Sequence, residues 1–146
     1  MSTAVDVLLV EDHVGDVLLV REALTPFGDQ VRLHVAGDGH QALQLLSDPN
    51  FPRPRFMLMD LHTPRMGALD VLAEMRQRAP WDVIPVIVYS SSALPADVLR
   101  AHRAGANAYL VKPTDFDTFC EVLGLTVRFW MSTVSPVETP RSATSE

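Results

Sequence analysis

Cysteine is almost absent from this sequence, which contains Cys120 and no other cysteine among its 146 residues. A single thiol excludes an internal disulfide and a cluster of thiolate metal ligands, and it favours a reducing compartment. No apolar run reaches the roughly 20 residues of a membrane-spanning helix, and the first residues lack the basic flank of a secretion signal. We therefore expect a cytoplasmic protein that does not have a membrane as its partner.

Basic residues are also sparse. The chain has 12 Lys and Arg against 18 Asp and Glu, a formal net charge of -6, and no basic block. This balance argues against nucleic acid as the main partner. The length fits one domain, which we place at residues 1–131. Residues 132–146 are rich in Ser and Thr with few apolar side chains, a composition that predicts a disordered tail.

Short apolar segments alternate along the chain with segments of helical periodicity. Segments that are apolar on both faces are typical of strands in a parallel sheet that is covered on both sides. The predicted strands are residues 5–10, 31–36, 56–59, 85–89 and 108–111. The predicted helices are residues 15–27, 39–46, 66–79, 95–106 and 114–130. We therefore expect an α/β, doubly wound (βα)5 fold with a central five-stranded parallel sheet.

Residues capable of chemistry follow four of the five predicted strands. Sites in such sheets form outside the carboxyl ends of the strands. The candidates there are Glu11, Asp12, Asp60, Ser90 and Lys112. Three carboxylates suit a hard divalent cation such as Mg²⁺, and a lysine among them indicates that an anion binds too, for which phosphate is the natural candidate. Asp60 would then be a nucleophile that accepts the phosphoryl group.

These residues resemble the receiver domain of two-component response regulators, a flavodoxin-like fold. The resemblance covers about residues 4–131 and rests on "LLVED" (8–12), "MLMDLHTPRM" (57–66), "VIVYSSS" (86–92) and "AGANAYLVKP" (104–113). More narrowly, "VEDHVGDVLLVREAL", "DLHTPRM" and "RFW" at 128–130 resemble the single-domain regulators of bacterial phytochrome kinases. The resemblance implies a phosphoacceptor signalling protein rather than an enzyme, with a sensor histidine kinase as its partner.

The resemblance also implies a role for each acidic position. Asp60 would accept the phosphoryl group. It would bind Mg²⁺ together with Glu11, Asp12 and the backbone carbonyl of His62. In the loop after Asp60, however, the usual Met-Asp-Gly reads Met-Gly-Ala at 66–68. Alanine tolerates glycine-type backbone conformations poorly, so we expect this loop to be rebuilt.

The remaining positions carry implied roles and open alternatives. Ser90 would hydrogen-bond a phosphoryl oxygen, with Ser91 as the competitor for that role, and Lys112 would pair with another oxygen. Tyr109 matches the family's aromatic switch, and plain core packing is its alternative. A cis peptide bond before Pro113 is implied as well. The first predicted helix and the loop after Lys112 would dock the kinase.

The last predicted helix carries two apolar stripes. The stripe expected to face the core consists of Phe116, Cys120, Leu123, Val127 and Trp130. The second stripe, Val122, Leu125 and Phe129, predicts an interface, and we expect a homodimer through the last helix and the fifth strand. The alternative is one wide face that lies in a broad groove.

Three other functions remain open at this stage. An aspartate-nucleophile phosphatase of the haloacid dehalogenase type would carry a second aspartate two residues after the nucleophile, where this chain has His62. A flavin-binding protein of the same topology would offer hydroxyls and amides to a phosphate, whereas the first loop offers Glu11 and Asp12. A receiver-like interaction module with weak or no phosphorylation is kept open by the altered loop.

Overall fold

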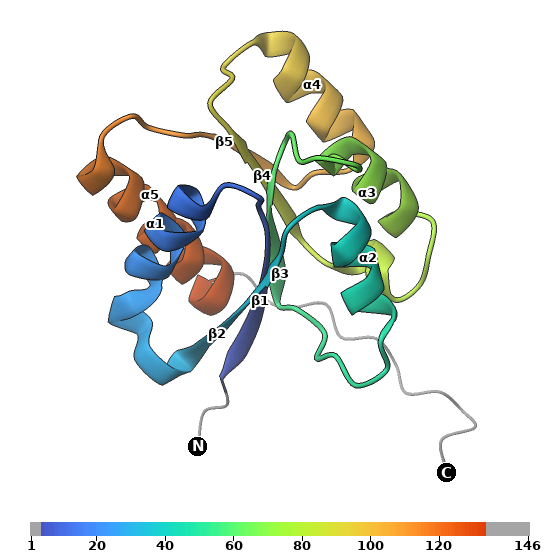
Figure 1. The fold of residues 1–146 in the computed structure, drawn as a ribbon, viewed down its shortest axis with the longest axis horizontal. Coiled ribbons are helices and arrows are strands. Elements are labelled where there is room, and N and C mark those ends of the chain that lie inside the picture. Colours follow the sequence, from blue (N-terminus) through green and yellow to red (C-terminus); the bar gives the residue numbers. More distant parts are fainter. Residues whose placement is uncertain (1–3, 134–146) are drawn as a thin grey trace.

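The structure, a computed structural model, describes residues 4–133. Five parallel strands alternate with five α-helices, as expected (Figure 1). The strands are β1 (Val5–Val10), β2 (Val31–Ala36), β3 (Phe56–Asp60), β4 (Val86–Ser90) and β5 (Ala108–Val111). The helices are α1 (Val14–Leu24), α2 (Gly39–Ser47), α3 (Ala68–Met75), α4 (Pro95–Ala104) and α5 (Phe116–Arg128), with the short segments η1 (Thr25–Gln30), η2 (Trp81–Val83) and η3 (Phe129–Thr133). The predicted strands agree to within one residue, and α3 is six residues shorter than its predicted range of fourteen.

The strands form one sheet in the order β2-β1-β3-β4-β5. Helices α1 and α5 cover one face of the sheet, and α2, α3 and α4 cover the other (Figure 1). The chain order reverses at β1, because β2 lies on one side of it and β3 on the other. The carboxyl ends of β1 and β3 therefore border the crevice in which ligands of such sheets bind.

Each face of the sheet has its own buried core. Alternate residues of β1 divide between them: Leu8 and Val10 pack toward α2 and α3, whereas Val7 and Leu9 pack toward α1 and α5. Because strand side chains point alternately to the two faces, a strand that is covered on both sides must be apolar throughout. The continuous apolar runs in the sequence follow from this requirement.

The ends of the helices are set by local signals. The Asp38 side chain accepts a hydrogen bond from the Gln41 N–H and caps α2, as its position predicts. Gly105 ends α4 in the left-handed conformation with φ of 112°, which a side chain would disfavour. The His13 ring caps α1 by accepting a hydrogen bond from the Asp16 N–H.

The predicted core stripe of the last helix is confirmed at Leu123 and Val127, and Cys120 and Trp130 pack against the same core, but it is wrong at Phe116. Phe116 is 49% exposed, and Cys120 is half-buried. The side chains that α5 buries are Phe119, Leu123 and Val127. The spacing of four residues in this series keeps all three on the face that meets the sheet, whereas Phe116 lies in the first turn and is exposed.

A charged cluster lies at the amino end of the sheet. The Asp6 carboxylate on β1 is buried, and it accepts hydrogen bonds from the Arg32 guanidinium at 2.9 and 3.1 Å. His34 Nε2 lies 2.9 Å from Asp6 Oδ1, so this histidine has a defined partner on β1. The bonds from Arg32 and His34 outweigh the opposing effect of burial and lower the pKa of Asp6.

We expect Asp6→Asn to reduce the free energy of unfolding by about 1–2 kcal/mol at pH 7. Because the pKa of Asp6 is lower in the folded state, its contribution is present above the unfolded pKa and is lost as the pH falls through the folded value. The difference between wild type and variant should therefore shrink in urea titrations below pH 3.8. Asp29→Asn, at an exposed position in η1, is the control. A difference that stays constant down to pH 2 would contradict this account.

Two further expectations concern the chain as a whole. The predicted tail lies outside the described residues from 134 onward, and its first two residues belong to η3. Among residues 4–133, no helix is long and apolar enough to cross a membrane.

Candidate functional site

Three carboxylates meet where β1 and β3 end. Glu11 and Asp12 follow β1, and Asp60 is the last residue of β3. One oxygen from each of them lies within 4.8 Å of the other two. Glu11 is fully buried, Asp12 is exposed, and Asp60 lies between these extremes. A set of hard oxygen donors with one solvent-facing member fits a divalent cation that keeps some of its waters.

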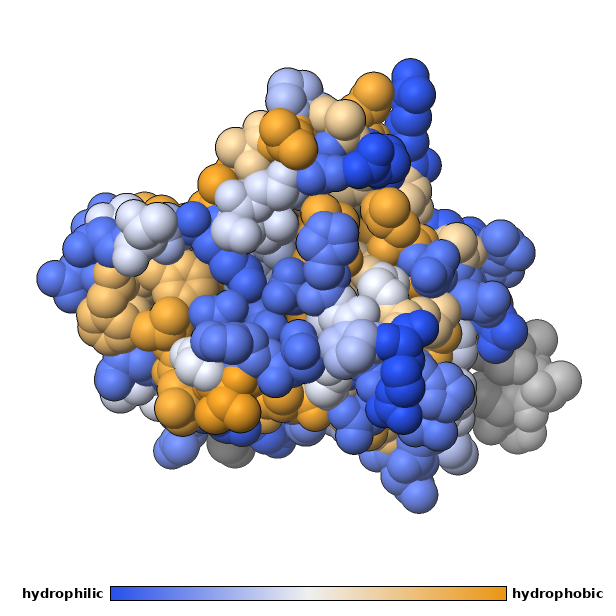
Figure 2. Space-filling view, turned by 45° about the horizontal axis from the view of Figure 1, so that its top comes forward, coloured by the Kyte–Doolittle hydropathy of each residue, from blue (hydrophilic) through white to orange (hydrophobic). Residues whose placement is uncertain are grey.

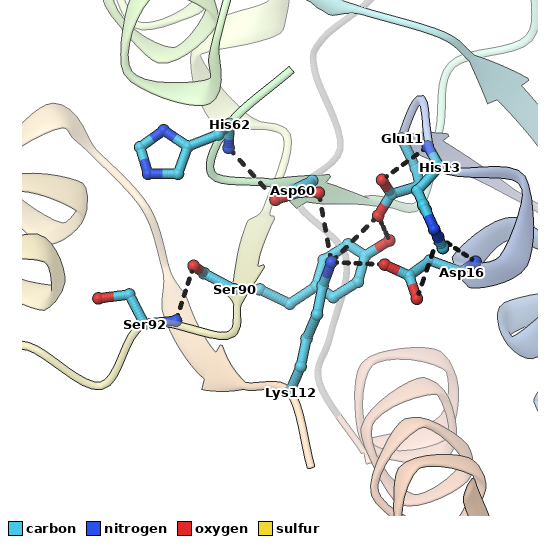
Figure 3. A network of polar contacts seen from close by, with 9 residues as sticks. Glu11, His13, Asp16, Asp60, His62, Ser90, Ser92 and Lys112 are labelled. Carbon is cyan, nitrogen blue, oxygen red and sulfur yellow. Dashed lines mark hydrogen bonds and ion pairs between the residues drawn. The ribbon is translucent and has the colours of Figure 1, made fainter. Parts of the chain in front are cut away.

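The Lys112 ammonium lies among three carboxylates, those of Glu11, Asp60 and Asp16 (Figure 3). Its Nζ is 3.3 Å from Glu11 Oε1, 3.2 Å from Asp60 Oδ2 and 2.8 Å from Asp16 Oδ2. Burial of the ammonium by itself lowers the pKa of Lys112. The hydrogen bond to Asp16 and the negative charges of Asp60, Glu11 and Asp16 outweigh this effect, so the pKa of Lys112 is raised. Lys112 is therefore a fixed positive charge beside the Asp60 carboxylate.

The Glu11 carboxylate is held from inside the protein. The buried Tyr89 hydroxyl donates a hydrogen bond to Glu11 Oε1 at 2.5 Å, and the His13 N–H donates to Oε2 at 3.1 Å. Burial raises the pKa of Glu11, an effect that exceeds the opposing hydrogen bonds. Burial and the neighbouring carboxylate also raise the pKa of Tyr89, so its hydroxyl keeps the proton that it donates. A cation bound at this edge would favour the ionised form of Glu11.

Two members of the site were missed in the sequence. Asp16 lies in the first turn of α1, directly after the His13 cap, and its carboxylate reaches Lys112. Tyr89 is the register partner of Asp60 on β4. The strand alignment thus carries a signal for Tyr89, but that alignment is known only once the sheet is assembled.

The backbone N–H of His62, and not its ring, contacts Asp60, the predicted phosphoacceptor. Its N–H donates to Asp60 Oδ1 at 3.2 Å, while the imidazole points away from Asp60 (Figure 3). The ring is exposed.

Ser90 and Tyr109 are linked through the loop after β4. Ser90 is the buried last residue of β4, whereas Ser91 is exposed. The Ser92 N–H donates to Ser90 Oγ at 3.1 Å, and the Tyr109 hydroxyl donates to the Ser92 carbonyl at 2.9 Å. The Ser92 hydroxyl donates in turn to Asp97 in the first turn of α4. A displacement of Ser90 would thus be felt at both Tyr109 and α4.

One expectation about backbone conformation is wrong, and a second concerns the altered loop. Among the described residues the cis peptide bond joins Ala79 to Pro80, so the bond before Pro113 is trans. The hydrogen bond from the Lys112 N–H to the Ser90 carbonyl, 2.7 Å long, aims the lysine by strand pairing instead. In the altered loop, Gly67 precedes α3 with an extended backbone and Ala68 begins the helix, so neither residue needs a left-handed conformation there.

Comparison with known proteins gives a consistent result. The family model described as "Response regulator receiver domain" matches residues 7–124. The response regulator Rcp1 of Synechocystis sp. is 35% identical over 134 residues, which are 88% of this chain and 90% of Rcp1. The Mn²⁺-bound form of Rcp1 matches the structure with a TM-score of 0.82 and 31% identity, over 91% of this chain and 99% of that one.

Two other solved structures share the fold across nearly the whole chain. The phosphorylated cyanobacterial phytochrome response regulator RcpA matches with a TM-score of 0.88 and 27% identity, over 93% of this chain and 100% of that one. RPA3017, a response regulator in red light signalling of R. palustris, matches with a TM-score of 0.83 and 30% identity, over 92% and 99% of the two chains.

Proposed function

The chain belongs to the response regulator receiver domain family and acts in two-component phosphorelay signalling, and within that role we propose that Asp60 is its phosphoacceptor. The observation that carries the proposal is the position of Asp60 between a pair of acids and the Lys112 ammonium. A carboxylate there can attack while Lys112, together with a divalent cation held by the acids, neutralises the incoming phosphoryl group.

The transfer follows from this geometry. An oxygen of Asp60 forms a bond to phosphorus while the bond between phosphorus and the imidazole of the kinase's phosphohistidine breaks, and the electron pair of that bond stays with the imidazole. Lys112 pairs with one phosphoryl oxygen, and Ser90 donates its hydroxyl to another. Glu11, Asp12, Asp60 and the His62 carbonyl would hold Mg²⁺, which supplies charge neutralisation when bound. The Mn²⁺-bound form of Rcp1 and a receiver domain of PA1611 with magnesium in its active site cleft support this cofactor.

The proposal is tested by incubating the full chain with acetyl phosphate. The intact mass should increase by one phosphoryl group in the presence of Mg²⁺, and EDTA should prevent the increase. A protein that stays unmodified at saturating Mg²⁺ would support the rival function of an interaction module that accepts no phosphate.

We propose further that the protein is a phosphoacceptor and not a phosphatase with turnover. The position at which a haloacid dehalogenase-type phosphatase places its second aspartate is His62, whose ring is turned away from Asp60 (Figure 3). No acid stands ready there to protonate a leaving alcohol. Incubation with phosphomonoesters should release no phosphate in excess over the protein.

We propose a phytochrome-type sensor histidine kinase in the cytoplasm as the partner. RcpA is described as a phytochrome regulator and RPA3017 as part of red light signalling. Apolar side chains are available for docking on α1, where Val14 is 71% and Leu18 59% exposed. Figure 2, in which the top of Figure 1 comes forward, has hydrophobic patches at the left of this face, the side of α1 and α5. Phosphotransfer from a phytochrome kinase that changes with illumination would support this partner, and transfer from unrelated kinases at equal rates would contradict it.

A homodimer through α5 and β5 is the assembly that we propose. Leu125 is 62% exposed and Phe129 49%, and Val111 at the end of the edge strand β5 is also exposed, while Val122 is half-buried. Such side chains gain about 25 cal/mol for each Å² that a partner covers.

The variant Leu125→Asp/Phe129→Asp should therefore sediment as a monomer at concentrations where the wild type is dimeric. Two buried carboxylates at a symmetric interface would repel their copies in the partner. Leu99→Asp, at a leucine on α4 that is 48% exposed, is the control and should remain dimeric. A double variant that still dimerises would locate the interface elsewhere.

A further inference from the structure

An ion pair next to the site joins the loop that follows β3 to the start of α2. The Arg65 guanidinium donates from Nε to Asp38 Oδ2 at 2.8 Å, and its Nη2 contacts the same oxygen. The Asp38 carboxylate is buried, whereas the Arg65 side chain is 72% exposed. The hydrogen bond from the Gln41 N–H and the pairing with Arg65 lower the pKa of Asp38, so the pair is charged.

Arg65 holds an unusual backbone conformation. Its φ is 66°, and among the described residues it is the one non-glycine residue with positive φ. Left-handed conformations are unfavourable for L-residues other than glycine and asparagine. No glycine or asparagine occupies the position, so contacts of Arg65 with the rest of the fold must keep the loop in this shape.

Backbone contacts join the same two segments. The Gly39 N–H donates to the Met66 carbonyl at 3.0 Å, and the Thr63 hydroxyl donates to that carbonyl at 2.6 Å. A Cβ on Gly39 would lie 2.6 Å from the Met66 carbonyl oxygen and 2.4 Å from Val71, so a glycine is required for this approach. The loop after β3 is therefore seated directly on the start of α2.

The other end of this loop reaches the site. The loop leaves β3 at Asp60, and His62, three residues before Arg65, is the residue whose carbonyl is proposed as a cation ligand. The position of that carbonyl depends on the path of residues 61–65. The start of this path is held by the bond from the Leu61 N–H to the Tyr89 carbonyl and the 3.2 Å bond from the His62 N–H to Asp60, and its far end by Arg65.

We propose that Arg65 is a positioning residue for the divalent cation: its ion pair with Asp38 holds the loop so that the His62 carbonyl faces the acids. The inference rests on the proposed function, because it takes Glu11, Asp12, Asp60 and the His62 carbonyl as the cation site. Groups that orient metal ligands without touching the metal contribute about tenfold or more to affinity. Arg65 acts in this way through the backbone.

The test is Mn²⁺ binding to the full chain, measured by the relaxation rate of water protons. Arg65→Ala should weaken Mn²⁺ binding about tenfold. Arg65→Lys, which keeps the charge but not the forked geometry, should recover part of this loss. Arg78→Ala is the matched control, because Arg78 is also exposed and ion-paired, with Glu74, but lies away from the loop. An Arg65→Ala affinity within twofold of the wild type would overturn the proposal.

A second variant separates positioning from general loss of structure. Asp38→Ser keeps a capping oxygen for α2 but removes the charge that Arg65 pairs with. It should weaken Mn²⁺ binding as much as Arg65→Ala, and the double variant should be no weaker than either single one. Additive losses would overturn the ion pair as the cause. At saturating Mn²⁺, phosphorylation of Arg65→Ala by acetyl phosphate should return to within twofold of the wild type.

If the proposed cation site itself is wrong, Mn²⁺ binding gives a different pattern of results. Asp12→Ala removes a proposed ligand and should abolish Mn²⁺ binding. If the wild type binds no Mn²⁺, or if Asp12→Ala binds it unchanged, the proposed cation site is wrong and the inference is overturned with it. If Asp12→Ala loses binding while Arg65→Ala does not, the inference alone is wrong.

Discussion

Asp60→Asn should lower the rate of Mg²⁺-dependent phosphorylation by acetyl phosphate at least about 100-fold relative to the wild type. An amide in this position is a poor nucleophile, and it removes one of the three carboxylates within 4.8 Å that would hold the cation. The substitution therefore removes the attacking oxygen and weakens binding of the cation that would neutralise the phosphoryl group. Mass spectrometry of the intact chain over a time course measures the rate.

The control for this variant is Asp70→Asn. Asp70 is an exposed acid in the first turn of α3 and makes no contact with Lys112 among the ion pairs of the described residues. It should be phosphorylated at the wild-type rate. Modification of Asp60→Asn at a comparable rate would mean that another side chain accepts the phosphoryl group, and Asp12 would be the first to examine.

Lys112→Met should lower the free energy of unfolding of the metal-free protein by about 2–4 kcal/mol. The ammonium is the shared partner of Glu11, Asp16 and Asp60, and methionine keeps much of its length without the charge. Three carboxylates then face one another without a counter-charge. Urea unfolding in EDTA measures the loss.

Mg²⁺ should reverse much of this loss in Lys112→Met. The ammonium and a divalent cation compete for the same carboxylates, so the variant should bind Mg²⁺ more tightly. Mg²⁺ that binds only the folded state raises the free energy of unfolding with the logarithm of the Mg²⁺ concentration divided by its dissociation constant. Stabilisation by Mg²⁺ should thus be larger in the variant than in the wild type. Arg103→Met, an exposed charge on α4, should show no such difference. An equal loss with and without Mg²⁺ would mean that Lys112 acts by packing.

Much of the site could be predicted because it depends on strand ends. A buried parallel strand must be continuously apolar, so the first charged residues after it mark the edge, as Glu11 does after β1 and Lys112 does after β5. Strand ends in a parallel sheet lie together whatever the exact packing of the helices. The acids and the lysine were therefore identified without knowledge of a single contact.

The residues that were wrongly predicted or missed depend on tertiary packing and not on strand ends. Phe116 and Phe119 lie three residues apart on one side of α5, and which of them is covered depends on where the first turn of the helix meets the rest of the fold. Asp16 joins the site because α1 begins at Val14 and turns its first acid inward. The lysine needs no cis bond because the pairing of β5 with β4 already aims it. Each of these depends on tertiary packing, to which local sequence is weakly coupled.

Strand β1 connects two separate polar clusters, the Asp6 cluster at its amino end and the candidate site at its carboxyl end. Asp6, near the amino end of β1, belongs to the charged cluster with Arg32 and His34. The carboxyl end of β1 leads into Glu11, which lies about 16 Å from Asp6 at the rise of an extended strand. At that separation, free-energy changes at the two ends should add. Stability could then drift or be engineered through Asp6, Arg32 and His34 while the phosphoryl chemistry stays untouched. A single six-residue strand would thus let the protein evolve its robustness and its signalling rate as independent properties.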